Sequence, residues 1–390
     1  MANSKPARIL AIDAFRGITI LVMIFVNTLA GVRGMPAWME HAAADADAMT
    51  FPDVVFPAFL FIVGMSIPFA MAQRQAAGDT AAQRWRHVLA RAAGLLVLGV
   101  FMVNAEDGYN EAAMGMSIHL WSLLFYGCAM LVWAVYRFEN KTLAVALRAV
   151  GAAGLLALAL AFRGGPDGSL RLAPQWWGIL GLIGWAYLYS TVAWSLTRAR
   201  LLPLGALVLA CTGLYCAAHT PALLSSAPLL GAQAENAVHT SIALCGLLTS
   251  LIFFGRGRDK PFRDALLLAL ALAVLAYVLR PYFRISKIYA TPSWALYSAT
   301  ICVLLFAALY WVVDVRRLNG WTAFFRPAAA NPLLVYIIPY IVYALMQLLH
   351  LALPDVLGSG LPGFLWALAY AMIVMALAAG LNRTHFTLQL

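Results

Sequence analysis

The side chains best suited to chemistry lie in residues 40–64, EHAAADADAMTFPDVVFPAFLFIVG. His41 is followed by three acids, Asp45, Asp47 and Asp53, and then by an uninterrupted apolar run. An imidazole accepts a proton near neutral pH, and a neighbouring carboxylate can orient it. The pattern therefore indicates a candidate acid–base site. The spacing alone also fits a solvated loop, so both interpretations stay open at this point.

A second polar group lies on the first apolar segment, which contains Asp13, Arg16 and Asn27. On a helix, Arg16 and Asn27 fall within roughly 20° of each other, and Asp13 lies within about 60° of both. Gly17 and Gly31 lie alongside them. One face is therefore predicted to carry an ion pair at one end, an amide at the other, and glycines that admit a close neighbour.

The loop LRPYFRISKIYATPSW (279–294) carries Arg280, Arg284 and Lys287 and contains no acid. Cations spaced three or four residues apart can converge on a phosphate. Contact with lipid headgroups explains the same charges equally well, so the sequence leaves both readings open.

Prolines mark two helix starts. Pro52 and Pro57 bracket Asp53: the first suits a helix start, and the second is expected to bend the helix and free a carbonyl. Asn331 before Pro332 predicts a helix cap followed by proline in the first turn. The alanine-rich segment after His41 is expected to form a short helix.

We expect four other histidines and the five cysteines to pack within the bundle or to lie at its surface. We place His119 and His350 inside spans and His87 and His385 at the inner surface. The five cysteines all fall in apolar runs without metal-type spacing, so we expect no metal site and interpret them as packing residues.

The composition of the chain that positions these residues indicates a membrane protein. Of its 390 residues 63% are hydrophobic and only 11% are charged, whereas a soluble domain carries about 25% charged residues. Apolar runs long enough to cross a bilayer recur throughout, and spans in lipid are helical when no barrel pattern is present. We therefore predict an all-α, polytopic integral membrane bundle of about 10–12 transmembrane helices, forming one domain over residues 1–390.

The candidate spans and the basic residues between them predict an orientation. We mark about twelve spans, at roughly 9–31, 52–73, 87–104, 117–136, 143–162, 176–196, 201–218, 236–255, 263–280, 293–313, 331–352 and 361–381. All but six of the 26 Lys and Arg then fall on one side. By the positive-inside rule this predicts cytoplasmic N- and C-termini in a bacterial-type inner membrane and a periplasmic His41. The net charge of +10 reports this orientation, so no nucleic-acid partner is expected.

Several stretches taken in order resemble one known family. They are RILAIDAFRGITILVMIFVNTLAG, FPDVVFPAFLFIVGMSI, ISKIYATPSWALYSATICVLLFAALYWVVDV and NPLLVY. Together they are similar to the transmembrane acyltransferases related to heparan-α-glucosaminide N-acetyltransferase, whose bacterial members are often labelled NagX or DUF5009 proteins. The resemblance covers most of the chain.

The resemblance implies transfer of an acetyl group from acetyl-CoA, across the membrane, to an amino sugar or glycan. It maps the essential histidine onto His41 and a conserved asparagine onto Asn27. Asp53, assigned to the catalytic group, or Asp45 is expected to orient the imidazole or to hold the ammonium of an amino sugar. We assign binding of the substrates to Asp13, Arg16, Asp45, Arg280, Arg284, Lys287, Trp294 and Asn331. Three points stay open. The protein is either a monomer or a homodimer, and the acetyl group passes either directly or through an acetyl-histidine intermediate. CoA enters either at the inner arginines or at the outer loop.

Two other functions compete with the acyltransferase. A secondary transporter such as a sugar permease fits the number of spans, although no acid or base lies near the middle of a span. A sensor or scaffold with a degenerate site fits the departure from the family pattern in the fourth span, SIHLWSLLFYGCAML. A second departure, HAAADA after His41, concerns the contacts to the sugar. Only the acyltransferase consumes acetyl-CoA and releases its thiol.

Overall fold

The computed structural model describes residues 9–220, 228–255, 259–384 and 386–390. Within these ranges the chain is built of helices and divides into two compact units. Unit 1 contains Met1–Val88 and Trp185–Ala329, and unit 2 contains Leu89–Gly184 and Ala330–Leu390. His385, which we predicted to lie at the inner surface, is outside the described ranges, as are residues 1–8, 221–227 and 256–258, whose lysine and arginines at positions 5, 8, 256 and 258 count among the Lys and Arg predicted on the inner side.

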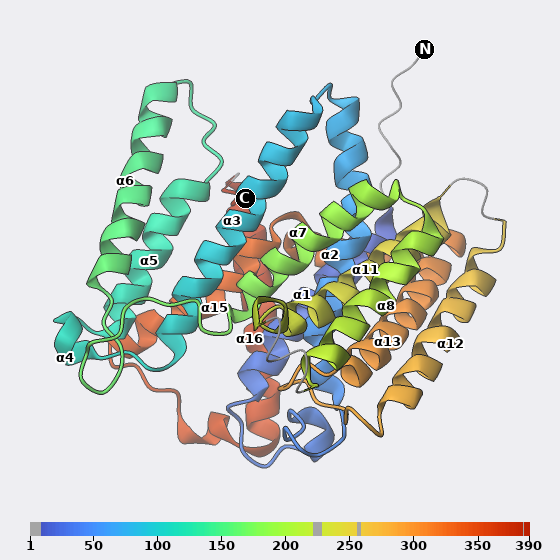
Figure 1. The fold of residues 1–390 in the computed structure, drawn as a ribbon. Helices are drawn as coiled ribbons and strands as arrows, with labels where there is room; N and C mark the ends of the chain where they lie inside the picture. Colours follow the sequence, from blue (N-terminus) through green and yellow to red (C-terminus); the bar gives the residue numbers. More distant parts are fainter. Residues whose placement is uncertain (1–8, 221–227, 256–258, 385) are drawn as a thin grey trace. The chain divides into compact units, whose positions relative to one another are not determined.

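The helices of the first unit are drawn in Figure 1. They are α1 (Leu10–Leu29), α2 (Phe51–Ala76), α8 (Leu201–Ala218), α10 (Pro228–Gly231), α11 (Ala234–Phe254), α12 (Pro261–Leu279) and α13 (Pro292–Tyr310). Shorter turns are η1 (Ala37–Met39), η2 (Trp311–Val315), η3 (Gly320–Phe325) and α14 (Arg326–Ala330).

The second unit contains α4 (Glu111–Met114), α5 (Ile118–Trp133), α6 (Lys141–Ala161), α15 (Pro332–Leu348), η4 (Asp355–Gly358) and α16 (Gly360–Arg383). Two helices, α3 (Ala81–Glu106) and α7 (Gly178–Thr197), run from one unit into the other.

The predicted polytopic helical fold is confirmed. Each of the predicted spans contains a helix, and 10 helices in the described ranges are long and apolar enough to cross a membrane. The helix α5 is shorter, with 16 residues. A bend of 72° separates α15 from the segment Gly320–Ala330, with which it makes an eleventh candidate.

Unit 1 is built around α11, which has 89% of its membrane-spanning window buried and packs against α2, α8 and α13. Glycines permit the closest of these contacts. A Cβ on Gly64 of α2 would overlap the Ala243 carbonyl, and one on Gly246 of α11 would overlap the Phe61 carbonyl. Backbones that approach this closely through small residues are typical of helix packing in lipid. The contact fixes α2, which carries Asp53, against the core of the unit.

The first half of α1 is held by contacts with η2 and η3. The Asp314 carboxylate of η2 accepts a hydrogen bond of 2.9 Å from the Ala11 amide, which the first turn of α1 leaves without a helical partner. On the same helix, a Cβ on Gly17 would lie 2.6 Å from Phe325. Glycine at this position therefore admits η3, as the sequence predicted for a close neighbour.

In unit 2, α5 packs against α6 and α15, and α15 packs against α16. The indole of Trp121 is fully buried and donates a hydrogen bond of 3.0 Å to the Leu158 carbonyl. The last residues of the chain run back along α5, where Gln389 donates to the Trp133 carbonyl.

Candidate active site

The candidate site is organised by one buried carboxylate, that of Asp53, which is 1% exposed and lies in the first turn of α2. Thr50 and Asp53 form a capping box at this helix start. One carboxylate oxygen of Asp53 accepts from the amides of Thr50 at 3.0 Å and Ala42 at 3.2 Å, and contacts the Thr50 hydroxyl at 3.0 Å. The other oxygen is therefore free for a different partner, and its direction is fixed.

That partner is His41. Its Nδ1 lies 2.6 Å from Oδ1 of Asp53, and its side chain is 35% exposed. A carboxylate can only accept a hydrogen bond, so the contact requires the proton on Nδ1. The tautomer set in this way leaves the lone pair on Nε2. The geometry is that of a histidine oriented by an acid, the arrangement found in general-base and nucleophilic catalysis.

A proline and a tryptophan anchor the same turn. Pro57 lies inside α2 and has no N–H, so it cannot bond the Asp53 carbonyl four residues before it. The indole of Trp294, which is fully buried on α13, donates to that carbonyl at 3.1 Å. The freed carbonyl expected from the sequence is thus present, and Trp294, assigned to substrate binding, contacts the backbone of Asp53.

Lys287 is the cation nearest the imidazole in the described ranges. Its Nζ lies 3.3 Å from Nδ1 and 3.2 Å from Nε2 of His41, so it contacts both ring nitrogens almost equally. Burial lowers the pKa of Lys287, while the negative charge of Asp53 opposes that change. This ammonium therefore gives up a proton more readily than an exposed lysine.

The two loops that supply His41 and Lys287 are joined by Asp47. Its carboxylate accepts from the Ile285 amide at 2.8 Å and from the Arg280 guanidinium at 3.2 Å. The Ile285 N–H and then Arg280 hold the pKa of Asp47 below its ordinary value. We predicted substrate binding for Asp45. This residue is exposed and makes no hydrogen bond to the loop of Lys287 within the described residues.

These contacts revise two expectations for the loops. The short helix expected after His41 does not form: the segment has turns and bends, because its amides bond the Asp53 side chain and Asp47 has a positive φ of 47°. In the predicted cation cluster, Arg280 is bound to Asp47 and Lys287 contacts His41. Arg284 is exposed and has no hydrogen bond or ion pair with another described residue.

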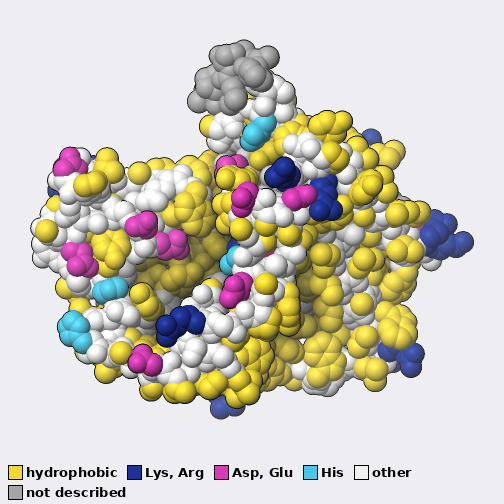
Figure 2. Space-filling model, turned by 90° about the horizontal axis from the view of Figure 1, so that it is seen from below, with side chains coloured by type: hydrophobic (Ala, Val, Ile, Leu, Met, Phe, Trp, Pro, Cys, Tyr) yellow, Lys and Arg dark blue, Asp and Glu magenta, His cyan; other side chains and the backbone are white. Residues whose placement is uncertain are grey.

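Asn27, the predicted amide donor, lies on the last turns of α1. Its side chain is exposed and makes no hydrogen bond within the part of the chain that the structure describes. The amide is therefore available to a ligand. Figure 2 shows the end of the molecule at which α2 begins, where acidic, basic and histidine side chains lie among hydrophobic ones.

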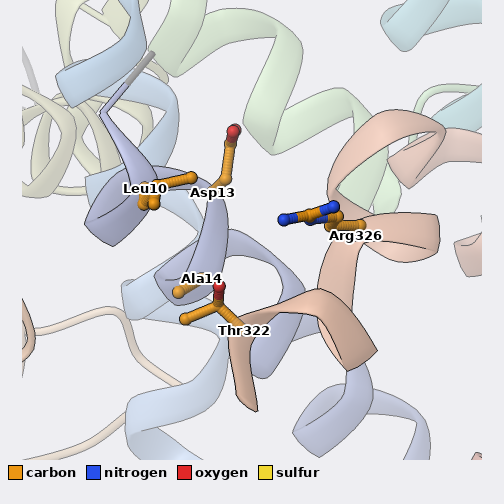
Figure 3. A pocket seen from close by; sticks show the side chains of 5 residues that line it. All are labelled: Leu10, Asp13, Ala14, Thr322 and Arg326. Carbon is orange, nitrogen blue, oxygen red and sulfur yellow. The ribbon is translucent and has the colours of Figure 1, made fainter. Parts of the chain in front are cut away.

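Asp13 and Arg16 lie at the opposite end of α1. They form the predicted ion pair, at 3.5 Å, and Arg16 also donates to the Ser66 hydroxyl of α2 at 2.6 Å. Asp13 lines a small pocket with Leu10, Ala14, Thr322 and Arg326 (Figure 3). Its volume of about 10 Å³ accommodates one water at most, so it is too small for a nucleotide.

Asn331 lies in unit 2, where its side chain contacts the end of the chain. It is the N-cap residue of α15 and is followed by proline in the first turn, as predicted, although its side chain makes no capping hydrogen bond. Its amide group instead donates to Asn382 and to the Phe386 carbonyl, and accepts from the Leu388 amide. These bonds hold the end of the chain.

A further histidine, His239, to which the sequence assigned no role, lies close to the site. This residue of α11 is 5% exposed, and its ring lies 5.6 Å from the Phe56 ring and 6.0 Å from the Trp294 ring. It therefore packs beneath the turn that carries Asp53. Its polar neighbours Thr240 and Ser241 indicated an interior face, but only the packing of α11 against α2 reveals the contact.

The sequence comparison now adds a family. Residues 8–229, more than half of the chain and including the His41–Asp53 pair, match the family described as Domain of unknown function (DUF5009). The chain belongs to the DUF5009 family.

Two known proteins are also similar to part of the chain. It is 32% identical over 103 residues to heparan-alpha-glucosaminide N-acetyltransferase of Homo sapiens and 31% identical over 103 residues to that of Mus musculus. In each case the match covers 26% of this chain and spans 15% of the length of the relative.

Proposed function

We propose that this DUF5009 protein is an integral-membrane acyltransferase that moves an acetyl group from acetyl-CoA to an amine or hydroxyl of an amino sugar or glycan. The observation that carries the proposal is the His41 imidazole, held at 2.6 Å by the buried Asp53 carboxylate. The similarity to proteins named as N-acetyltransferases supports acyl transfer as the chemistry that we propose for this acid–base pair.

In the proposed reaction, His41 moves the protons. The acceptor nitrogen attacks the thioester carbonyl while Nε2 of His41 takes a proton from that nitrogen, which gives a tetrahedral oxyanion and an imidazolium. The C–S bond then breaks, the acetyl group stays on the acceptor as an amide, and the CoA sulfur leaves with the proton that His41 returns. Asp53 accepts the Nδ1–H throughout and stabilises the imidazolium.

We assign two donors to the oxyanion. The Lys287 ammonium lies 3.2 Å from Nε2 of His41. A tetrahedral oxyanion that forms beside this nitrogen would therefore lie close to the positive charge of Lys287. The exposed Asn27 amide is uncommitted and can donate an N–H. One such donor contributes about 10²–10³ in rate in other acyl-transfer enzymes.

The proposal also includes the orientation of the protein in the membrane and the side from which acetyl-CoA binds. The asymmetry of Lys and Arg supports cytoplasmic chain ends, a bacterial-type inner membrane and a periplasmic His41. In the outer loop, Arg280 and Lys287 are already bound to Asp47 and His41. The inner arginines, such as the exposed Arg86, are therefore the better site for the CoA phosphates.

The test is thiol release in proteoliposomes loaded with glucosamine. The wild-type protein should release one CoA thiol for each acetylated sugar, and His41→Gln should not. His87→Gln, which changes an exposed histidine near the start of α3, should behave as wild type. Accumulation of unmodified sugar without thiol release would instead establish a permease. Radiolabel that stays on the protein when acceptor is withheld would select the acetyl-histidine route over direct transfer.

A further inference from the structure

A primary amine of the protein itself lies beside the His41 imidazole. Nζ of Lys287 is 3.2 Å from Nε2 of His41, while Nδ1 of the same ring faces Asp53. The proton on Nδ1 leaves the lone pair on Nε2, so Nε2 is the ring atom that can accept a proton from Nζ. A general base must lie within about 2.6–3.2 Å of the atom whose proton it removes. Lys287 therefore meets the geometric requirement for an acceptor nitrogen.

The turn that carries Lys287 is held on both sides by hydrogen bonds. The Ile285 amide donates to Asp47 at 2.8 Å. The Ser286 amide donates to the Thr291 hydroxyl at 3.0 Å, and the Thr291 amide donates to the Ser286 carbonyl at 3.0 Å. Ser286 is only 3% exposed. The backbone at Lys287 is therefore fixed, and the contact between its amine and the ring follows from a defined turn.

No acid of the described residues forms an ion pair with this amine. Asp53, the acid whose charge acts on Lys287, is committed to His41 and to two backbone amides. An ion pair would keep the lysine protonated, whereas burial lowers its pKa. The neutral amine, which is the nucleophilic form, is therefore easier to reach for Lys287 than for a lysine in an ion pair.

We propose that Lys287 is an internal acceptor, which the protein acetylates with its own acetyl donor and which stops the transfer when no sugar is bound. The inference rests on the proposed function, because it requires acetyl transfer at His41. It adds a modification site and a means of regulation to that function.

The reaction balances with acetyl-CoA as the only co-substrate. Nζ of Lys287 gives one proton to Nε2 of His41, which passes it to the solvent. The Nζ lone pair then forms an N–C bond to the thioester carbon, and the C–S bond breaks. The sulfur leaves as a thiolate and takes the second proton of Nζ, while the third stays on the new amide.

Acetylation at this position ends the transfer. An amide is far less reactive than a thioester, so acetylated Lys287 does not pass its acetyl group to a sugar. The modification also removes the positive charge of the lysine, which we assigned to the oxyanion. A sugar amine that takes the position beside Nε2 of His41 excludes Lys287 from it, so a bound acceptor protects the lysine.

The test is incubation of the purified full-length protein in detergent with acetyl-CoA and no sugar, followed by digestion and mass spectrometry. Lys287 should be acetylated at least about 10²-fold faster than the exposed Lys141 and Lys260, which report uncatalysed acetylation. His41→Gln should lower the rate at Lys287 to that of the two exposed lysines and leave their rates unchanged. Added glucosamine should slow the acetylation of Lys287.

Lys287→Arg is the matched variant, because it keeps the positive charge and removes the reactive amine. After incubation with acetyl-CoA alone, the wild type should lose thiol release with glucosamine in proportion to the acetylation of Lys287. Lys287→Arg should keep the rate that it had before the incubation. Neutral hydroxylamine should leave the acetyl group on the lysine, whereas it would remove one from a histidine.

Acetylation of Lys287 at the rate of Lys141 and Lys260, or at an equal rate in His41→Gln, would overturn the inference. If glucosamine is acetylated and Lys287 is not, the inference fails and the acyltransferase stands. If neither is acetylated, both fail. Acetylation of Lys287 that depends on His41, without acetylation of glucosamine, would support the internal acceptor and refute the sugar as the acceptor.

Discussion

Replacing Asp53 by asparagine exchanges one carboxylate oxygen for an NH2 group and tests how the imidazole is oriented. The carboxylate accepts from His41, from the Thr50 and Ala42 amides, and contacts the Thr50 hydroxyl. Asparagine has one acceptor oxygen and one NH2 group. The oxygen will face the two backbone amides, because the NH2 group would otherwise meet two donors. The NH2 group then faces Nδ1 of His41.

This arrangement reverses the tautomer of His41. Nδ1 becomes the acceptor, the proton moves to Nε2, and the lone pair that receives the acceptor's proton is lost. In a serine protease the same substitution lowers kcat by about 10⁴, and positioned general bases contribute about 10²–10⁴. We expect Asp53→Asn to lower the rate of thiol release by about 10²–10⁴. The two backbone amides keep an acceptor, so the helix start should lose no more than about 1 kcal/mol.

The assay is thiol release from acetyl-CoA by purified protein with glucosamine, with size-exclusion chromatography to check folding. Thr50→Ser retains the capping hydroxyl and serves as the control, with activity near wild type. If Asp53→Asn folds and keeps more than half of the wild-type rate, the contact at 2.6 Å does not orient a catalytic histidine and the reasoning fails.

Four further outcomes are expected. Lys287→Met should lower the rate about tenfold or more while Lys287→Arg recovers part of it, measured by the same thiol assay; equal rates for both would exclude an electrostatic role. The folded-state pKa of Asp47 is depressed, so its stabilisation is present above the unfolded value and is lost as pH falls below about 4; limited proteolysis of its loop should therefore be constant from pH 5 to 8 and increase only in acid. Gly64→Ala should lower the melting temperature in detergent, whereas Gly127→Ala, with no atom within 4 Å of the added Cβ, should not. A cysteine at Ala43, in a background without native cysteines, should react with an impermeant maleimide from outside intact cells, and a reaction only after lysis would reverse the proposed orientation.

The helices were predictable because their signal is local. Runs of apolar residues predicted every span, and the bounds of α8 were correct at both ends. The start of α2 was also predictable, since Pro52 and the freed carbonyl at Asp53 follow from short-range chemistry. The bend before α15 was missed because it depends on tertiary packing.

The sequence allowed us to predict the pair His41 and Asp53, but not the contacts of Asp47 and Lys287 that hold the loops around it. Asp53 could be named because it lies in the first turn of a helix that begins near His41. The choice between Asp45 and Asp47 required the position of Ile285, which is 238 residues away along the chain from Asp47. The Lys287 contact depends on the same docking of distant loops, and no periodicity encodes it.

The central claim is that one histidine, oriented by a buried carboxylate, carries the transfer. Single-turnover transfer of [14C]acetyl from acetyl-CoA to glucosamine, compared between the wild type and His41→Gln, tests it most directly. The account predicts label on the sugar with the wild type and a rate at least about 10²-fold lower with the variant. Equal rates for the two proteins, with both correctly folded, would contradict it.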